Sequence, residues 1–452
     1  MALIELDLTA RPDQLPRSRP PARLYRLPGL LLVAVLALAA GGAAPVLPVL
    51  WRYVGAVPAP LGPEAPFQLT GGRVYTTERA GQDRITTAWE VAEPPRQLWS
   101  ARFPVRASAP DEISFGGLNA VQAGDVVLLS DGPETTVVDA ATGERVWSSP
   151  VGVTPLPGGR TGIVQDSEFR DDTLYDQSSG EPGLLFFGAT GEPHTEPPLR
   201  TDVRGVELAT GRPLWTLSAA GSVNVLVAPG DAPALLLLSS DRLQRIDGAG
   251  GRVVASVALP SPDGGRPTGG ELVDGLMMVY YGRDGVIDRE VAYRADSLAR
   301  VWSRAVPEVL LDRANCSGLH CAGSLRALDV LDPRTGEPRW RAPTGVDLTK
   351  RGGYVIEVGS ESGMPERLVD AETGAVRVDL AAWRAEVMGD ESQPIVLRRS
   401  VGAESAFGVV VPRRDAVQPL GVTGRPVGDC TSDRFHVVCR AGGELRIWAY
   451  RA

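Results

Sequence analysis

One short phrase recurs along the chain and constrains the fold more than any other feature. It reads VVDAATGERVW at 137–147, VELATGRPLW at 206–215 and LDPRTGEPRW at 331–340, with a degenerate copy, VDAETGAVRV, at 369–378. Alternating or β-branched residues flank a Thr-Gly turn in each full copy, which predicts strand, tight turn, strand. A chain that repeats one such unit builds an array of similar units.

The aspartate and the glycine of the phrase have separate tasks in the turn. The Asp139 carboxylate can accept hydrogen bonds from the backbone amides that follow it. Gly143 can adopt the left-handed conformation that closes a short hairpin with a bulge. The expected turn residues are Asp139, Gly143, Gly211, Asp332, Gly336, Asp370 and Gly374.

The tryptophan of the phrase falls on the outgoing strand, where a large flat ring can pack against a neighbouring copy. Looser copies of the phrase lie at 86–103, 243–257, 292–306, 408–421 and 443–450. Intervals of roughly 40 to 50 residues between tryptophans are typical of one four-stranded blade. The tryptophans expected at this docking position are Trp99, Trp147, Trp215, Trp302, Trp340 and Trp448.

The copies also indicate how many blades to expect. Nine copies enclose eight intervals, and the last strand must pair beside the first so that no sheet edge stays open. We therefore expect an all-β propeller over 66–452, with eight blades favoured and seven possible.

The D-x-x-T-G-x-x-x-W phrase resembles the repeat of the pyrroloquinoline-quinone-like (PQQ-like) β-propellers. That superfamily includes quinoprotein alcohol dehydrogenases and the lipoprotein that helps to assemble outer-membrane β-barrels. The resemblance covers about residues 65–452 and implies the fold, but it implies little about activity, because the phrase builds and docks hairpins. With its N-terminal apolar segment, the chain also resembles the single-pass, propeller-bearing proteins of actinobacteria.

An uncharged apolar segment, residues 27–50, precedes the repeats. It is long enough to cross a hydrocarbon core of about 30 Å. Arginines crowd its N-terminal side, so the positive-inside rule keeps 1–26 in the cytoplasm and exports the remainder. A cleaved signal peptide is the alternative, because the run also has the form of an h-region followed by small residues.

We therefore expect a cytoplasmic segment at 1–26, a transmembrane helix at 27–50 and a Pro-rich extended spacer at 51–65. Trp51 and Tyr53 suit the membrane–water interface beyond the helix. The protein is expected to be a single-pass cell-membrane protein with an extracytoplasmic propeller.

The four cysteines form two local pairs, Cys316 with Cys321 in NCSGLHC and Cys430 with Cys439 in DCTSDRFHVVC. An even count on the oxidising side of a membrane predicts two disulfides with this pairing. Zinc is the disfavoured alternative; histidines lie near both pairs, but structural zinc needs compact sets of ligands.

Motifs for catalysis are sparse. A P-loop is excluded, because the only lysine, Lys350, does not follow a glycine. The chain has three histidines at unrelated points of the repeat, and no two cysteines are adjacent, whereas quinoprotein dehydrogenases hold their cofactor beneath a disulfide of adjacent cysteines. We therefore expect no catalytic, cofactor-binding or metal-binding residue, and no cofactor.

These observations favour a non-catalytic binding or scaffold propeller that presents its loops to a protein or cell-envelope partner. The alternative is a small quinoprotein-type dehydrogenase that uses the propeller channel. A net charge of −9 disfavours nucleic acid as a partner. An acidic insertion at 165–182 is interpreted as a solvated loop, with a partner-binding loop or a loose calcium site as alternatives, although its spacing does not match the D-x-D-x-D-G pattern of a calcium loop.

Overall fold

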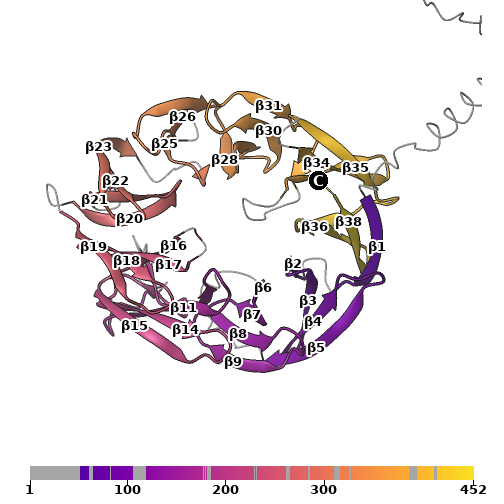
Figure 1. The fold of residues 1–452 in the computed structure, drawn as a ribbon, viewed down its shortest axis with the longest axis horizontal. Helices are drawn as coiled ribbons and strands as arrows, with labels where there is room; N and C mark the ends of the chain where they lie inside the picture. The colour runs from indigo at the N-terminus through magenta and orange to yellow at the C-terminus, as the bar shows by residue number, and fades with distance from the viewer. Residues whose placement is uncertain are drawn as a thin grey trace, which may run out of the picture. The chain divides into compact units, whose positions relative to one another are not determined.

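Nine small sheets follow one another around a ring, the arrangement of a β-propeller (Figure 1). In the ring view the first strand of a typical sheet lies near the centre and the last lies on the outside. The predicted all-β propeller is confirmed. The structure is a computed structural model that describes residues 51–451 except 61–64, 82, 105–118, 177, 179, 181–184, 229, 231, 261–264, 284–285, 310–315, 325–326, 386–393 and 412–414.

We number the sheets as blades 1 to 9 in chain order, and each is given from its inner to its outer strand. Blades 1 to 5 consist of β2 (Phe67–Thr70), β3 (Arg73–Ala80), β4 (Asp83–Glu90) and β5 (Arg96–Pro104); β6 (Asn119–Ala123), β7 (Val126–Asp131), β8 (Glu134–Asp139) and β9 (Arg145–Ser149); β10 (Val153–Pro155), β11 (Thr161–Glu168), β14 (Arg200–Glu207) and β15 (Pro213–Ala220); β16 (Asn224–Ala228), β17 (Ala234–Leu238), β18 (Arg242–Asp247) and β19 (Val253–Ala258); and β20 (Arg266–Val273), β21 (Leu276–Arg283), β22 (Val286–Arg294) and β23 (Arg300–Val309).

Blades 6 to 9 complete the ring. They consist of β25 (Cys321–Ser324), β26 (Ala327–Leu331) and β27 (Pro338–Ala342); β24 (Cys316–Ser317), β28 (Val346–Arg351), β29 (Tyr354–Gly359), β30 (Pro365–Asp370) and β31 (Val376–Asp379); β32 (Arg384–Ala385), β33 (Val396–Val401), β34 (Glu404–Val411) and β35 (Ala416–Val422); and β36 (Gly428–Ser432), β37 (His436–Ala441), β38 (Glu444–Tyr450) and β1 (Trp51–Pro58).

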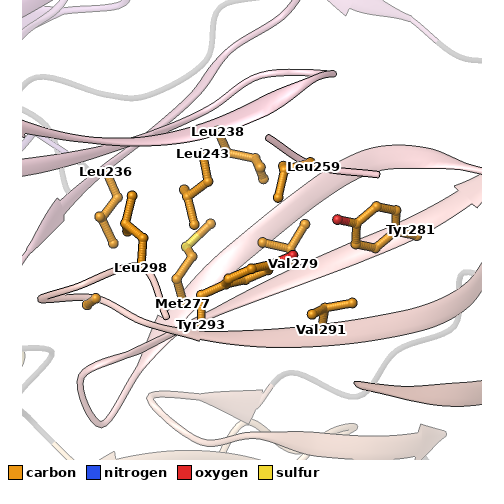
Figure 2. Packing of buried hydrophobic residues seen from close by; sticks show 11 residues of the cluster. Leu236, Leu238, Leu243, Leu259, Met277, Val279, Tyr281, Val291, Tyr293 and Leu298 are labelled. Atoms are coloured by element: carbon orange, nitrogen blue, oxygen red, sulfur yellow. The ribbon is translucent and has the colours of Figure 1, made fainter. Parts of the chain in front are cut away.

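The hydrophobic core lies between successive blades. Figure 2 shows one such layer, in which Leu236 and Leu243 of blade 4 pack with Met277, Val279 and Tyr293 of blade 5. The second strand of blade 5, β21, is buried over Leu276–Gly282, because neighbouring blades cover both of its faces. A continuous apolar run such as LMMVYY is typical of a strand in that position.

The ring has nine blades, so the prediction of eight, with seven possible, is wrong. Each copy of the phrase belongs to one blade, and a closed ring has one further interval, from the last copy back to the first. That interval is closed by β1, which pairs with β38 from Trp51 opposite Tyr450 to Pro58 opposite Glu444. The N-terminal strand therefore completes blade 9.

The expected spacer at 51–65 is wrong for residues 51–58, which form β1. Trp51, expected at a membrane–water interface, packs inside the propeller instead. Its ring stacks at 5.0 Å on Phe407 and at 5.5 Å on Trp448. Pairing with β38 and these aromatic contacts outweigh the tendency of the Gly- and Pro-containing sequence to stay unpaired.

The expected cytoplasmic segment 1–26 and transmembrane helix 27–50 lie outside the described residues. Within the part of the chain that the structure describes, no helix has the length and apolar character needed to cross a membrane.

The insertion in blade 3 is partly a strand. Residues 165–168 end β11, and the excursion runs from there to β14. It contains a short hairpin of β12 (Phe186–Phe187) and β13 (Pro193–His194). The His194 ring stacks on Phe169 at 3.7 Å, so the excursion is held to the end of β11 by aromatic packing.

Candidate functional site

The turn of the repeated phrase is built as the sequence indicates. Oδ1 of Asp139 accepts hydrogen bonds from the backbone N of Ala141 and Thr142, at 2.9 and 2.8 Å, and from Oγ1 of Thr142 at 3.0 Å. Gly143 donates its N–H to the carbonyl of Asp139 and has a φ of +74°. The backbone amide of Thr142 is the main cause that holds the pKa of Asp139 below its usual value.

The other predicted turn residues occupy the same place in their blades. Asp332 accepts a hydrogen bond from the backbone N of Arg334, and Asp370 accepts one from the backbone N of Thr373. The glycines of these turns share a left-handed conformation, with φ of +72° at Gly211, +76° at Gly336 and +67° at Gly374.

Five of the six predicted tryptophans dock on the next blade. In each case the indole Nε1 donates to a carbonyl in the turn that follows along the ring. The pairs are Trp99 to Ala140 at 3.1 Å, Trp147 to Leu208 at 2.7 Å, Trp215 to Gly248 at 3.0 Å, Trp302 to Pro333 at 2.9 Å, and Trp340 to Ala371 at 3.1 Å.

The turn glycine has a second task that the sequence analysis missed. A Cβ added at Gly143 would lie 2.4 Å from Cδ2 of Trp99, and one at Gly211 would lie 2.7 Å from Cδ2 of Trp147. The absent side chain leaves room for the indole of the preceding blade. The alternation of Trp and Thr-Gly along the sequence contains this signal, because each Trp precedes the glycine on which it packs.

Trp448 does not occupy the docking position, so this part of the prediction is wrong. It lies on β38, the third strand of blade 9, between β37 and β1. Its ring packs toward blade 8 at 6.3 Å from Phe407. The outer strand of this blade is β1, from the N-terminal side of the propeller, which pairs with β38.

Both predicted disulfides are present, so the four cysteines are not zinc ligands. Cys430 and Cys439 face each other across β36 and β37, and Cys439 is fully buried beside Trp448. Cys316 and Cys321 instead begin β24 and β25, where the construction of a blade departs from the pattern.

Blade 6 has three strands in the described residues, β25 to β27. The Thr-Gly turn of this blade joins β26 to β27, whereas in blade 2 it joins the third strand to the fourth. By this correspondence the missing strand of blade 6 is the innermost one. The preceding segment, β24, pairs in parallel with β28 of blade 7 instead, with Cys316 opposite Leu348.

A cavity of about 620 Å³ lies where blade 5 faces the disulfide loop and β25. Blade 5 contributes Glu271, Tyr280 and Glu290 to its wall, and the opposite side includes Cys316, Cys321 and the backbone from Ser317 to Leu319. The hydroxyl of Tyr280 donates to Oε1 of Glu271. The cavity thus has a polar wall with two carboxyl groups.

Glu290, one of the wall residues, belongs to a buried cluster of charged groups with Arg304 and His320. Oε2 of Glu290, a residue that is 1% exposed, accepts a hydrogen bond from Nε of Arg304 at 2.9 Å. Nε2 of the buried His320 lies 3.1 Å from the same oxygen, and its Nδ1 lies 3.9 Å from Oε1 of Glu271. Neither ring nitrogen makes a hydrogen bond of good geometry.

The environment favours the charged forms of both groups. Burial alone would lower the pKa of His320, but the carboxylates of Glu271 and Glu290 raise it above the usual value. Burial would raise the pKa of Glu290, but His320 and Arg304 lower it below the usual value. With Arg304 opposite Glu290, the cluster is an ion-pair network on the cavity wall.

Glu271, Glu290 and His320 were not among the predicted site residues. Glu290 and Arg304 are opposite each other on β22 and β23, and a Glu–Arg cross-strand pair is visible once the register is known. His320 reaches them from a separate segment, for which no local sequence signal exists. Among the described residues, no group of three or more His, Cys, Asp or Glu side chains is placed to hold a metal ion.

No protein-family model matches the chain. No curated protein matches it either. Solved structures do match, at identities of 11% or less in the three cases described next.

BamB from Moraxella catarrhalis is 11% identical, with a TM-score of 0.38, over 88% of this chain and 98% of that chain. A eukaryotic initiation factor is 11% identical, with a TM-score of 0.48, over 81% of this chain and 91% of that chain. A europium-containing methanol dehydrogenase is 10% identical, with a TM-score of 0.37, over 88% of this chain and 93% of that chain. The propeller that the resemblance predicts is shown by the chain's own sheets, to which these structures are similar at low identity.

Proposed function

We propose that this chain is a non-catalytic binding propeller, anchored in the cell membrane by residues 27–50, that receives a protein partner at the cavity of blade 6. One observation supports this function most directly. A polar cavity of about 620 Å³ lies beside blade 6, which has three strands among the described residues, whereas the preceding blade 5 has four. Such a place offers both volume and unpaired strand edge to a partner.

The repeated residues do not compete for this task. The tryptophans, aspartates and glycines of the phrase are occupied in turns and in contacts between blades. The cavity wall uses other residues, Glu271, Tyr280 and Glu290. The residues of the phrase therefore hold the ring together, and the cavity wall is formed by residues outside the phrase.

The experiment uses the full-length chain in its native membrane, with a photo-crosslinking amino acid at Ala322. A matched variant has the crosslinker at Val146, an exposed residue on the outer strand of blade 2. We expect one partner protein to be captured at Ala322 and not at Val146. The captured protein, once purified, should bind the full-length chain and compete with the crosslink.

The enzyme alternative is tested on the same protein. Pyrroloquinoline quinone is titrated into it with and without calcium, and binding is followed by absorbance and thermal shift. We expect no stoichiometric binding and no dye-linked oxidation of alcohols or sugars. Tight binding with turnover would overturn the binding function and establish a quinoprotein-type dehydrogenase.

A further inference from the structure

The inner edge of blade 6 is open in the described structure. β25 pairs with β26 from Cys321 opposite Val330 to Ser324 opposite Ala327, and no strand of the described residues lies on its other side. An antiparallel strand directs alternate N–H and C=O groups toward each of its edges. The open edge of β25 therefore presents backbone donors and acceptors beside the cavity, whose wall includes Cys321, Ala322 and Gly323.

The chain's own nearest strand is held away from this edge. Cys316 and Ser317 pair with Leu348 and Thr349 of blade 7. The disulfide joins Cys316 to Cys321, the first residue of β25. The crosslink therefore ties the segment that pairs with blade 7 to the start of blade 6, and among the described residues no segment occupies the place of the fourth strand.

The charge on the facing wall indicates what that segment contains. Glu271 is 41% exposed in its side chain, and its neighbours at the wall are Tyr280 and Glu290. Arg304 and His320 both face the buried Glu290, and His320 also lies 3.9 Å from Oε1 of Glu271, so that of the two carboxylates only Glu271 has a side chain open to solvent. The accessible Glu271 is therefore positioned to meet a positive charge that enters the cavity.

We propose that blade 6 is completed by an extended peptide segment of a partner protein, which adds to β25 as a strand and places an arginine or lysine opposite Glu271. This inference rests on the proposed binding function and names the chemistry of the partner. Strand addition supplies affinity through main-chain hydrogen bonds, and a side-chain pocket supplies specificity. Here the cavity is that pocket.

The probe is a phage-displayed random heptapeptide library, selected on the full-length protein in detergent. We expect the selected peptides to share β-forming residues and one arginine or lysine at a fixed place. Glu271→Lys should weaken their binding by at least about tenfold, because an attractive pair becomes a repulsive one. The matched control, Glu144→Lys, reverses an exposed charge on the blade 2 turn and should leave binding unchanged.

Main-chain pairing is tested separately. Ala322→Pro removes a backbone N–H from β25, and its own thermal unfolding is measured first. If that variant does not fold, hydrogen exchange on the parent protein gives the same information. Peptide binding should slow amide exchange in residues 321–324, and should leave the amides of β8 unchanged.

Three outcomes would overturn the inference. The selected peptides could bind the Glu271→Lys variant as tightly as the parent protein. The amides of β25 could already be protected without peptide, which would show that the chain itself covers the edge. The protein could instead form concentration-dependent dimers that exclude the peptide. Partner capture at Ala322 without any role for Glu271 would refute only this inference, whereas quinone turnover would refute the proposed function.

Discussion

Two junctions between blades fill the space between an outer strand and the next turn in opposite ways: in one the large residue is on the strand, and in the other it is in the turn. Between blades 1 and 2, the large Trp99 lies on the outer strand and Gly143 lies in the facing turn. Between blades 4 and 5, Ala255 lies on the outer strand where the other blade has tryptophan, and Leu298 lies in the turn where the other blade has glycine. The N–H of Leu298 donates to the carbonyl of Arg294, and this is the same hydrogen bond that Gly143 makes to Asp139. Ala255 packs against the cluster that contains Leu298, a residue that is 4% exposed.

Leu298 adopts this place at a cost in backbone energy. Its φ is +58°, in the left-handed region that glycine occupies in the other turns. The left-handed conformation costs an L-residue roughly 1–2 kcal/mol, and burial of a leucine side chain contributes about 1.5–3 kcal/mol in the opposite direction. Packing therefore outweighs the strain when no indole fills the space.

The junction between blades 9 and 1 shows a third solution. Gly55 lies on the outer strand β1, and a Cβ there would be 2.3 Å from Cδ of Pro95 in the next blade. A ring again meets a residue without a side chain, but now the ring lies in the connection before the outer strand of blade 1. At all three junctions the space between the blades is filled by one large side chain opposite a small residue. The large side chain lies on the outer strand at one junction, in the turn at another and in the connection before the outer strand at the third.

Removal of the indole at a Trp–Gly junction should have the largest effect. Trp99 is 6% exposed, so Trp99→Ala should lower the free energy of unfolding by about 3–5 kcal/mol. Equilibrium denaturation in urea, followed by circular dichroism, measures this. Val146→Ala, at a side chain that is 41% exposed, is the control and should change little. Equal midpoints for the two variants would show that the indole does not hold the blades together.

Substitutions at the junction between blades 4 and 5 should have an intermediate effect on the free energy of unfolding. Ala255→Trp alone should cost about 1–3 kcal/mol, because the indole would overlap Leu298. Leu298→Gly alone should cost about 1–3 kcal/mol, since a buried side chain is lost while backbone strain is relieved.

The double variant decides whether the two residues act as one unit. Ala255→Trp with Leu298→Gly rebuilds the Trp–Gly arrangement, so its loss should be smaller than the sum of the single losses by about 1 kcal/mol or more. The measurement is a double-mutant cycle of unfolding free energies. Simple additivity would contradict the volume argument for this junction.

The sequence predicts the propeller because its information is local and repeated. The hairpin, the Asp139 turn and the place of five docking tryptophans follow from one phrase and its period. The junction at Leu298 could not be predicted in the same way, since neither the tryptophan nor the glycine is present there to signal it. The blade number was wrong because Trp51 belongs to a strand whose partner, β38, is at the other end of the chain.

The candidate site was less accessible to sequence reasoning. The cavity depends on where the chain goes before Cys321, and the pairing of Cys316 with Leu348 joins segments of two different blades. The contact between His320 and Glu290 depends on the packing of blade 5 against the disulfide loop. Long-range placements of this kind leave no periodic pattern in the residues themselves.

The smallest expected change in the free energy of unfolding concerns the carboxylates of the turns, and it should differ between the turn of blade 2 and the turn of blade 5. Asp139 accepts hydrogen bonds from the turn, so Asp139→Asn should lower the free energy of unfolding by about 1 kcal/mol at neutral pH. In blade 5 the equivalent position is Arg294, which pairs with the exposed Asp296. Asp296→Asn should therefore cost less, because an exposed ion pair contributes little.

The pH dependence of this difference gives a sharper test. The pKa of Asp139 is lower in the folded state than its ordinary value. Its stabilising contribution is then fully present above the unfolded pKa of about 3.9 and is lost as the pH falls through the folded value. Urea denaturation of the parent protein and Asp139→Asn between about pH 7 and about pH 3 should show the two curves converging in acid. A gap that stayed constant over this range would mean that the carboxylate charge does not stabilise the turn, and that the shape of the side chain alone does.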